Sequence, residues 1–186
     1  MIAPQMSIAN PKIPNDVLSF EMSAQETVKR IRIKLNVNGS DYFVDLEKGY
    51  ELLSEVLRDR LGLTGTKRGC DFGGCGCCSL MIDNELFYSC MMPAIRAVGK
   101  KITTIEGLEK DGVLSAVQQG FVDHFAFQCG YCTPGMIMSG TALLAEIPNP
   151  TEDQIKEGIG GVICRCTGYV KIIEDIKAAS EAKKNS

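Results

Sequence analysis

The sequence lacks tryptophan and has a single histidine, His124, among its 186 residues. A Rieske iron–sulfur centre takes two histidine ligands, so this chain cannot supply one. A histidine-based zinc site or a catalytic pair of histidines is excluded for the same reason. We interpret His124 as a surface residue on the polar flank of a helix.

Several other features are absent. The sequence has no stretch of 18 or more apolar residues, no run of Lys or Arg, and no glycine-rich phosphate-binding motif. With a net charge of −3, it is not expected to span a membrane or bind nucleic acid. The N-terminal residues also lack the pattern of a secretory signal, and residues 1–27 contain no arginine. We therefore expect a cytoplasmic globular protein.

Cysteine, in contrast, is abundant: the chain has nine. In a reducing compartment such a number indicates metal ligation or redox chemistry rather than a disulfide framework. The odd total weakens the disulfide interpretation further.

The first half of the chain predicts an α+β fold. Residues 1–29 are polar, contain three prolines and have no regular period, so we interpret them as an N-terminal extension. Apolar and polar residues then alternate as in half-buried strands, and apolar residues at helical spacing predict one helix ended by Gly62. The predicted strands are residues 31–37, 42–46, 79–82, 86–88 and 101–105, and the helix is residues 52–61. Asn38-Gly39 and Asp83-Asn84 are turn sequences.

The second half predicts only helices. Leu114, Val117, Phe121 and Phe125 fall on one helical stripe after Val113. The domain boundary near residues 107–112 gives an extension at 1–29, a first domain at 30–108 and a second at 109–182.

Capping residues mark three further helices. Thr133 can cap a helix that has Pro134 in its first turn and reaches Glu146. Thr151 and Gln154 have the spacing of a capping box for a short helix. The apolar stripe of a final helix consists of Tyr169, Ile172, Ile173 and Ile176.

The cysteines form two sets of four. Cys70, Cys75, Cys78 and Cys90 have the Cys-x4-Cys-x2-Cys spacing, with a distant fourth cysteine, of plant-type [2Fe-2S] ferredoxins. Glycines at 69, 73, 74 and 76 allow this loop to fold back tightly. A four-cysteine zinc site is the alternative. Cys77 lies between two ligands, and we interpret it as a small buried neighbour.

The second set combines a Cys-x2-Cys with a Cys-x-Cys motif. Its members are Cys129, Cys132, Cys164 and Cys166. We interpret them as ligands of a second [2Fe-2S] cluster, placed at a helix N-terminus whose dipole stabilises negative charge. A thioredoxin-like dithiol at Cys129 and Cys132 is the alternative, although such a motif normally follows a strand. Arg165 lies between two ligands and could raise the reduction potential, or be an ordinary solvated side chain.

Three sequence blocks carry a family resemblance. Residues 69–78 (GCDFGGCGCC), 128–136 (QCGYCTPGM) and 164–169 (CRCTGY) closely resemble the small iron–sulfur subunit of the molybdenum hydroxylases. This family includes xanthine dehydrogenase, aldehyde oxidase, carbon monoxide dehydrogenase and 4-hydroxybenzoyl-CoA reductase. The resemblance covers about residues 31–179. This sequence departs from the family pattern at Cys77, where a small residue is usual, and at Val162-Ile163, where Asn-Leu is usual.

The resemblance implies a β-grasp ferredoxin domain followed by a helical-bundle domain, each with one [2Fe-2S] cluster. It further implies that Gln128 and Cys166 contact a molybdopterin cofactor, which belongs to a large partner subunit, while FAD belongs to another. A heterotrimer or a dimer of heterotrimers is implied.

The leading functional hypothesis is therefore an electron-transfer subunit of a multi-subunit molybdenum-dependent oxidoreductase. Electrons would pass between the molybdopterin site and FAD, or another acceptor, through the two clusters, with no substrate chemistry on this chain. A free-standing ferredoxin-like carrier and a zinc-binding interaction module are the alternatives. They would be separated by behaviour in isolation and by metal analysis.

Overall fold

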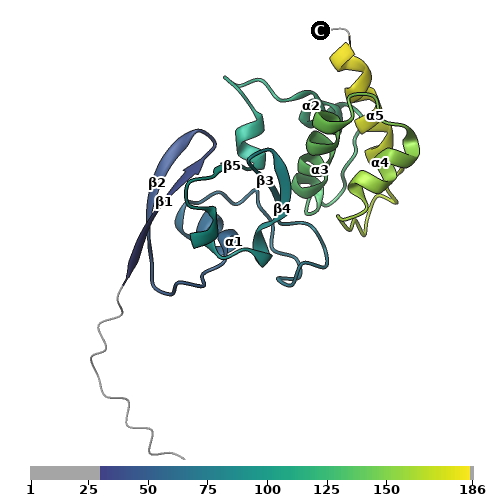
Figure 1. The fold of residues 1–186 in the computed structure, drawn as a ribbon. Coiled ribbons are helices and arrows are strands. Elements are labelled where there is room, and N and C mark those ends of the chain that lie inside the picture. Colours follow the sequence, from purple (N-terminus) through teal and green to yellow (C-terminus); the bar gives the residue numbers. More distant parts are fainter. Residues whose placement is uncertain (1–29, 185–186) are drawn as a thin grey trace, which may run out of the picture.

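The computed structural model describes residues 30–184, and the predicted extension at 1–29 lies outside them. A mixed five-stranded sheet occupies one side of the molecule, and four helices occupy the other (Figure 1). The strands are β1 (Ile31–Val37), β2 (Ser40–Leu46), β3 (Ser79–Ile82), β4 (Glu85–Tyr88) and β5 (Lys101–Thr103). The principal helices are α2 (Ala116–Asp123), α3 (Thr133–Glu146), α4 (Glu152–Ile159) and α5 (Val170–Lys184). Among the described helices, none is both long enough and apolar enough to cross a membrane.

The sheet has the strand order β2-β1-β5-β3-β4. β1 pairs antiparallel with β2 and parallel with β5, whereas β3 pairs antiparallel with both β4 and β5. Both predicted hairpin turns form, and Asn38, Gly39, Asp83 and Asn84 all have positive φ angles. With one helix packed on the sheet, this arrangement confirms the expected β-grasp fold.

The helix predicted at residues 52–61 is present in a modified form. It consists of a short turn, α1 (Leu53–Glu55), that continues as a π-helical segment, η2 (Val56–Arg60). Leu53, Val56 and Leu57 are fully buried against the sheet, as their helical spacing predicted. Short 3-10 segments complete this half: η3 (Ser89–Met91), η4 (Ala94–Ala97) and η5 (Ile105–Leu108).

The apolar helical stripe predicted from Leu114 to Phe125 is wrong at its first and last residues. α2 runs only from Ala116 to Asp123, and of the predicted stripe only Val117 and Phe121 are buried. Phe125 has a positive φ angle of 53° and is 79% exposed. The helix has ended at Asp123, and the chain turns at Phe125 before the cysteine loop that begins near residue 129. The helical spacing of apolar residues therefore does not predict the burial of Phe125.

Of the two predicted helix caps, the one at Thr151 is confirmed and the one at Thr133 is wrong. The Thr151–Gln154 capping box forms, because the Gln154 N–H donates to the Thr151 hydroxyl and the Thr151 N–H donates to the Gln154 side chain. Thr133, however, is not a cap. The carbonyl of Cys132 already accepts the Met136 N–H at 3.0 Å, so α3 begins one residue earlier with Cys132 as its N-cap.

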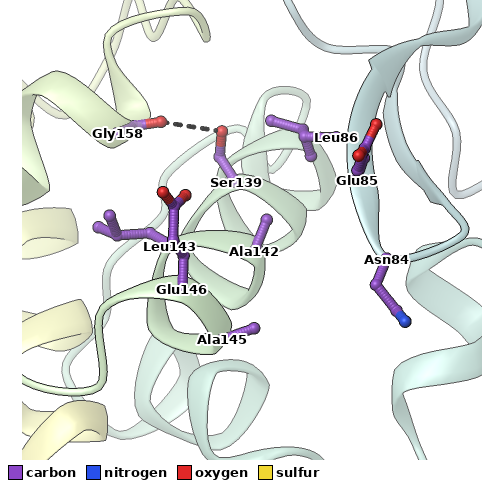
Figure 2. A pocket seen from close by; sticks show the side chains of 9 residues that line it. All are labelled: Asn84, Glu85, Leu86, Ser139, Ala142, Leu143, Ala145, Glu146 and Gly158. Atoms are coloured by element: carbon purple, nitrogen blue, oxygen red, sulfur yellow. Dashed lines mark hydrogen bonds between the residues drawn. The ribbon is translucent and has the colours of Figure 1, made fainter.

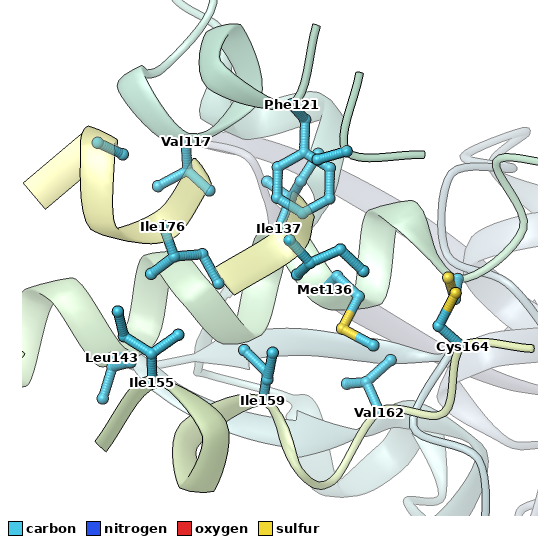
Figure 3. Packing of buried hydrophobic residues seen from close by; sticks show 14 of the residues in the cluster. Val117, Phe121, Met136, Ile137, Leu143, Ile155, Ile159, Val162, Cys164 and Ile176 are labelled. Atoms are coloured by element: carbon cyan, nitrogen blue, oxygen red, sulfur yellow. The ribbon is translucent and has the colours of Figure 1, made fainter. Parts of the chain in front are cut away.

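The second half packs around its own hydrophobic core (Figure 3). Val117 and Phe121 from α2, Ile176 from α5, and residues of α3 and α4 meet there, with Cys164 at one edge. α3 also packs against β3, and its Met138 lies in the core of the sheet. The second half is thus helical, as predicted, and α3 belongs to both cores.

A cavity of about 600 Å³ lies between the β3–β4 hairpin and α3 (Figure 2). It is lined by Asn84, Glu85, Leu86, Ser139, Ala142, Leu143, Ala145, Glu146 and Gly158. Ser139 closes one side by donating to the carbonyl of Gly158 at 3.2 Å. No cysteine lines this cavity, so the candidate chemistry of the chain lies elsewhere.

Candidate metal centres

The structure brings the first set of cysteines (Cys70, Cys75, Cys78 and Cys90, hereafter the first site) to one loop and its neighbouring 3-10 turn. The loop folds back through Gly73 and Gly76, which have φ angles of +77° and +68°. A side chain at Gly69 would place its Cβ 2.9 Å from the sulfur of Cys75. Glycine is therefore required there by the proximity of a sulfur atom.

Backbone N–H groups surround the sulfur of Cys70. The N–H of Phe72, followed by the Cys75 side chain and the N–H groups of Cys75 and Gly74, lowers the pKa of the Cys70 thiol to about 7. The Gly74 and Cys75 N–H groups lie 3.2 and 3.3 Å from that sulfur. Such donors stabilise a thiolate, which is the form that binds metal.

Cys90 reaches the first site from the turn after β4. The Ser89 hydroxyl and N–H both donate to the carbonyl of Cys78, at 2.8 and 3.3 Å, and so hold Cys90 beside Cys78. Burial, followed by the adjacent thiol of Cys78, raises the pKa of Cys90 to about 11. An isolated thiol here would stay protonated, whereas a bound metal cation would favour its thiolate.

The second set (Cys129, Cys132, Cys164 and Cys166, hereafter the second site) gathers at the start of α3. The sulfurs of Cys129 and Cys166 lie 3.5 Å apart, and both residues are exposed. Cys132 and Cys164 are buried, and burial followed by the Cys164 thiol raises the pKa of Cys132 to about 12. The paired sulfurs are therefore 129 with 166 and 132 with 164, not the 129 with 132 of a dithiol.

Polar groups also support Cys164. Burial disfavours its thiolate, but the hydroxyl and N–H of Thr167 outweigh this and lower its pKa. The Thr167 oxygen lies 3.1 Å from the sulfur. The phenol oxygen of Tyr169 accepts the N–H of Cys164 at 2.8 Å, a role that the helical stripe of Tyr169 did not predict. Tyr169 has a positive φ angle of 69° and lies immediately before α5, not within that helix.

The remaining sequence candidates have varied environments. Gln128 is exposed beside Cys129, on the open edge of the second site, and Arg165 is exposed as well. Cys77 is buried, as predicted, and lies in the core of the second half. Burial, then Cys75, raises the pKa of Cys77 to about 12. His124 is partly exposed, yet its ring nitrogen lies 3.4 Å from the buried carboxylate of Asp175.

All nine cysteines are free of disulfides. Within residues 30–184, no three His, Cys, Asp or Glu side chains converge closely enough to hold one metal ion. A two-iron cluster does not need such convergence, because each iron takes two cysteine sulfurs. The paired thiols and the N–H groups around them fit a [2Fe-2S] cluster at each site.

Each half of the chain matches a known family of iron–sulfur domains. Residues 35–96 match the family described as 2Fe-2S iron-sulfur cluster binding domain, and residues 104–177 match the [2Fe-2S] binding domain family. The chain is 41% identical to the nicotinate dehydrogenase small FeS subunit of Eubacterium barkeri, over 85% of this chain and 100% of that protein. It is also 41% identical to the xanthine dehydrogenase iron-sulfur-binding subunit of Escherichia coli O157:H7, over 82% of this chain and 96% of that protein.

A solved structure gives the same result. A chain of quinoline 2-oxidoreductase from Pseudomonas putida 86 superposes with a TM-score of 0.80 and 40% identity, covering 84% of this chain and 98% of that chain. The chain described here therefore belongs to the small [2Fe-2S] iron–sulfur subunits of the molybdenum hydroxylase family.

Proposed function

We propose that each site holds one [2Fe-2S] cluster through its four cysteines. The ligands of the first cluster are Cys70, Cys75, Cys78 and Cys90, and those of the second are Cys129, Cys132, Cys164 and Cys166. The observation that carries this assignment is the pairing of sulfurs from distant segments, such as Cys129 with Cys166 at 3.5 Å. Each [2Fe-2S] cluster accepts and returns one electron.

The chain acts as the electron-transfer subunit of an oxidoreductase. We propose that electrons pass between a molybdopterin site on a large partner subunit and FAD on another, or another acceptor, in a heterotrimer or a dimer of heterotrimers. The exposed Gln128 and Cys166 would contact the molybdopterin. We further propose a cytoplasmic location. We also propose a division into domains at 30–108 and 109–182, and the residue ranges of the two family matches support this division.

Three structural features of this chain act on the sulfurs of the proposed clusters. The N–H groups around Cys70 and the hydroxyl and N–H of Thr167 at Cys164 stabilise negative charge on sulfur. The N-terminus of α3, beginning at Cys132, adds its dipole to the same effect. Burial of Cys78, Cys90, Cys132 and Cys164 keeps water from the inner sulfurs. The hydrogen-bond donors, the helix dipole and the burial of the inner sulfurs all support one-electron chemistry at the clusters, and none of them requires a substrate pocket on this chain.

Metal and sulfide analysis with EPR tests the assignment. The full chain, purified with its partner subunits, should contain about four irons and as many sulfides per chain. Partial reduction should give two distinguishable S = 1/2 signals. Zinc without iron, or a single EPR signal at full iron content, would refute the proposal.

A further inference from the structure

The cavity between the β3–β4 hairpin and α3 belongs to neither cysteine site (Figure 2). The hairpin contributes Glu85 and Leu86 to one wall, and α3 contributes Ala142 and Glu146 to the other. The hairpin is part of the first half of the chain, and α3 is part of the second. A group bound in this cavity would therefore contact both halves at once.

Contacts behind the cavity hold its walls in place. Met138, the residue before Ser139 on α3, is fully buried in the core of the sheet and so fixes α3 against β3. The Ser139 hydroxyl donates to the Gly158 carbonyl at 3.2 Å and joins α3 to the end of α4. On the other wall, Asn84 forms the hairpin turn with a φ angle of 71°. A cavity formed in advance can bind a partner with little loss of conformational entropy.

The lining combines an apolar surface with negative charge. Carbon atoms come mainly from Leu86, Ala142 and Leu143. Among the described residues that line the cavity, only Glu85 and Glu146 are charged, and both are exposed. Within residues 30–184, neither of their carboxylates has an ion-pair or hydrogen-bond partner. Unpaired carboxylates on two facing walls favour a positively charged group between them.

We propose that this cavity receives a lysine side chain from a partner subunit of the complex. The methylene stem of a lysine can pack on the apolar lining while its ammonium group reaches the two carboxylates. A compact ammonium with three donors suits two carboxylates on separate walls, whereas the planar fork of arginine suits one carboxylate held in two contacts. This inference rests on the proposed function, because it needs a partner subunit.

Other occupants match the lining less well. A two-fold contact between copies of this chain would bring the same patch of each copy together, so the carboxylates of Glu85 and Glu146 would meet their own equivalents. Like charges that meet at an interface repel. A hard metal cation needs about six oxygen ligands. Within the described residues, however, no third His, Cys, Asp or Glu converges with these two carboxylates.

The test uses the full chain assembled with its partner subunits. Glu85→Gln combined with Glu146→Gln removes both charges and keeps the size of the side chains. The matched control combines Glu47→Gln with Glu181→Gln, which are exposed carboxylates on other elements. Ala145→Trp fills the cavity without changing its charge, and Ala145→Ser is the control for that change. Because Ala145 is exposed, neither substitution disturbs a core.

The measured quantity is the dissociation constant between this chain and its partners, determined by mass photometry at increasing NaCl concentration. We expect the Glu85 and Glu146 double variant to raise it about tenfold at low salt, with a smaller difference at high salt because salt screens charge pairs. Ala145→Trp should raise it at all salt concentrations, because its effect is steric. Both controls should match wild type.

A carbodiimide cross-link identifies the occupant, because this reagent joins a carboxylate directly to a lysine amine. In the wild-type complex, mass spectrometry should find Glu85 or Glu146 joined to a lysine of a partner subunit. The double glutamine variant should lack this product, and Ala145→Trp should reduce its yield. The Glu47 and Glu181 control variant should form it as wild type does.

Three results would overturn the proposal. They are an unchanged dissociation constant in the double variant, an equal rise in its control, and the absence of a cross-link to a partner lysine, including a cross-link to a second copy of this chain. Failure of the proposed function looks different. In that case the wild-type chain would lack four irons or two EPR signals, or would not purify with partner subunits at all.

Discussion

Met138 and Cys77 each lie in the hydrophobic core of the opposite half of the chain. Met138, from α3, is fully buried among the sheet residues, and Cys77, from the first cysteine loop, is buried among the helices. The two cores are therefore interlocked by side chains. This relationship leads us to expect that the halves unfold together, and it motivates the first prediction.

Met138→Ala should destabilise the whole described chain. Removing a fully buried methionine side chain leaves a cavity in the core of the sheet, with an expected cost of about 2–5 kcal/mol in the free energy of unfolding. Chemical denaturation followed by far-UV circular dichroism would measure it. Met91→Ala is the control, since Met91 is 60% exposed, and it should change stability by less than about 0.5 kcal/mol. Separate transitions for sheet and helices would contradict interlocking.

Gly76→Ala should force the two halves apart. Alanine there combines a positive φ angle with overlap on the Gly161 carbonyl, so we expect a loss of about 2–5 kcal/mol and a lower iron content. Gly99→Ala is the matched control. Gly99 has a similar φ of +78°, but a Cβ there meets nothing within 4 Å, so only about 1–2 kcal/mol should be lost. Equal effects of the two substitutions would show that contact between the halves is unimportant.

Cys75→Ala should remove one cluster and leave the other. We expect iron to fall from about four to about two per chain, with the loss of one S = 1/2 signal. Cys77→Ala should retain about four irons, because we assign Cys77 no ligand role. Iron and sulfide analysis of the two purified variants is the measurement. Loss of two irons from the Cys77 variant would mean that the ligand assignment is wrong.

Asp175→Asn should change the dependence of stability on pH. Burial raises the pKa of the Asp175 carboxyl to about 6, although His124 partly offsets this, and the nearby Asp123 raises it further. Because the folded-state pKa exceeds the unfolded value of about 4, wild-type stability should fall as pH rises from about 4 to about 6 and then level off. The asparagine variant should lack this fall.

The variant should therefore be more stable than wild type by about 1–2 kcal/mol at pH 8, a figure that allows for solvent screening. At pH 4 the two proteins should be nearly equal. Asp123→Asn, at an exposed position, is the control and should keep most of the wild-type pH dependence. Urea midpoints across this pH range would check the prediction. A constant difference at all pH values would contradict it.

Local signals were sufficient to predict most elements. The alternation of Ile33, Leu35 and Val37 reported a strand with one buried face, and the Thr151 capping box marked a helix start. Each signal lies within a few residues and needs no tertiary information. Cysteine spacing likewise identified both sets of sulfurs that the structure brings together.

The errors and omissions arise where contacts between distant parts of the chain, rather than local sequence, determine the conformation and environment of a residue. Phe125 continued an apolar period, but the chain reverses at its positive φ angle, and the side chain is exposed. Met138 lies in the core of the sheet rather than among the helices, a placement that no local pattern within its own helix specifies. The hydrogen bonds from the Cys164 N–H to the Tyr169 phenol oxygen and from the Ile163 N–H to the Cys75 carbonyl connect groups whose sequence positions give no local signal.

The exposed edge formed by Cys129 and Cys166 has a practical consequence for handling the protein. Oxygen and chelators can approach the second site from that edge whenever a partner subunit does not cover it. The inner pair at Cys132 and Cys164 is shielded. A chain purified alone in air is therefore expected to decay from its outer sulfurs inward, so anaerobic preparation together with its partners is the appropriate route to the intact molecule.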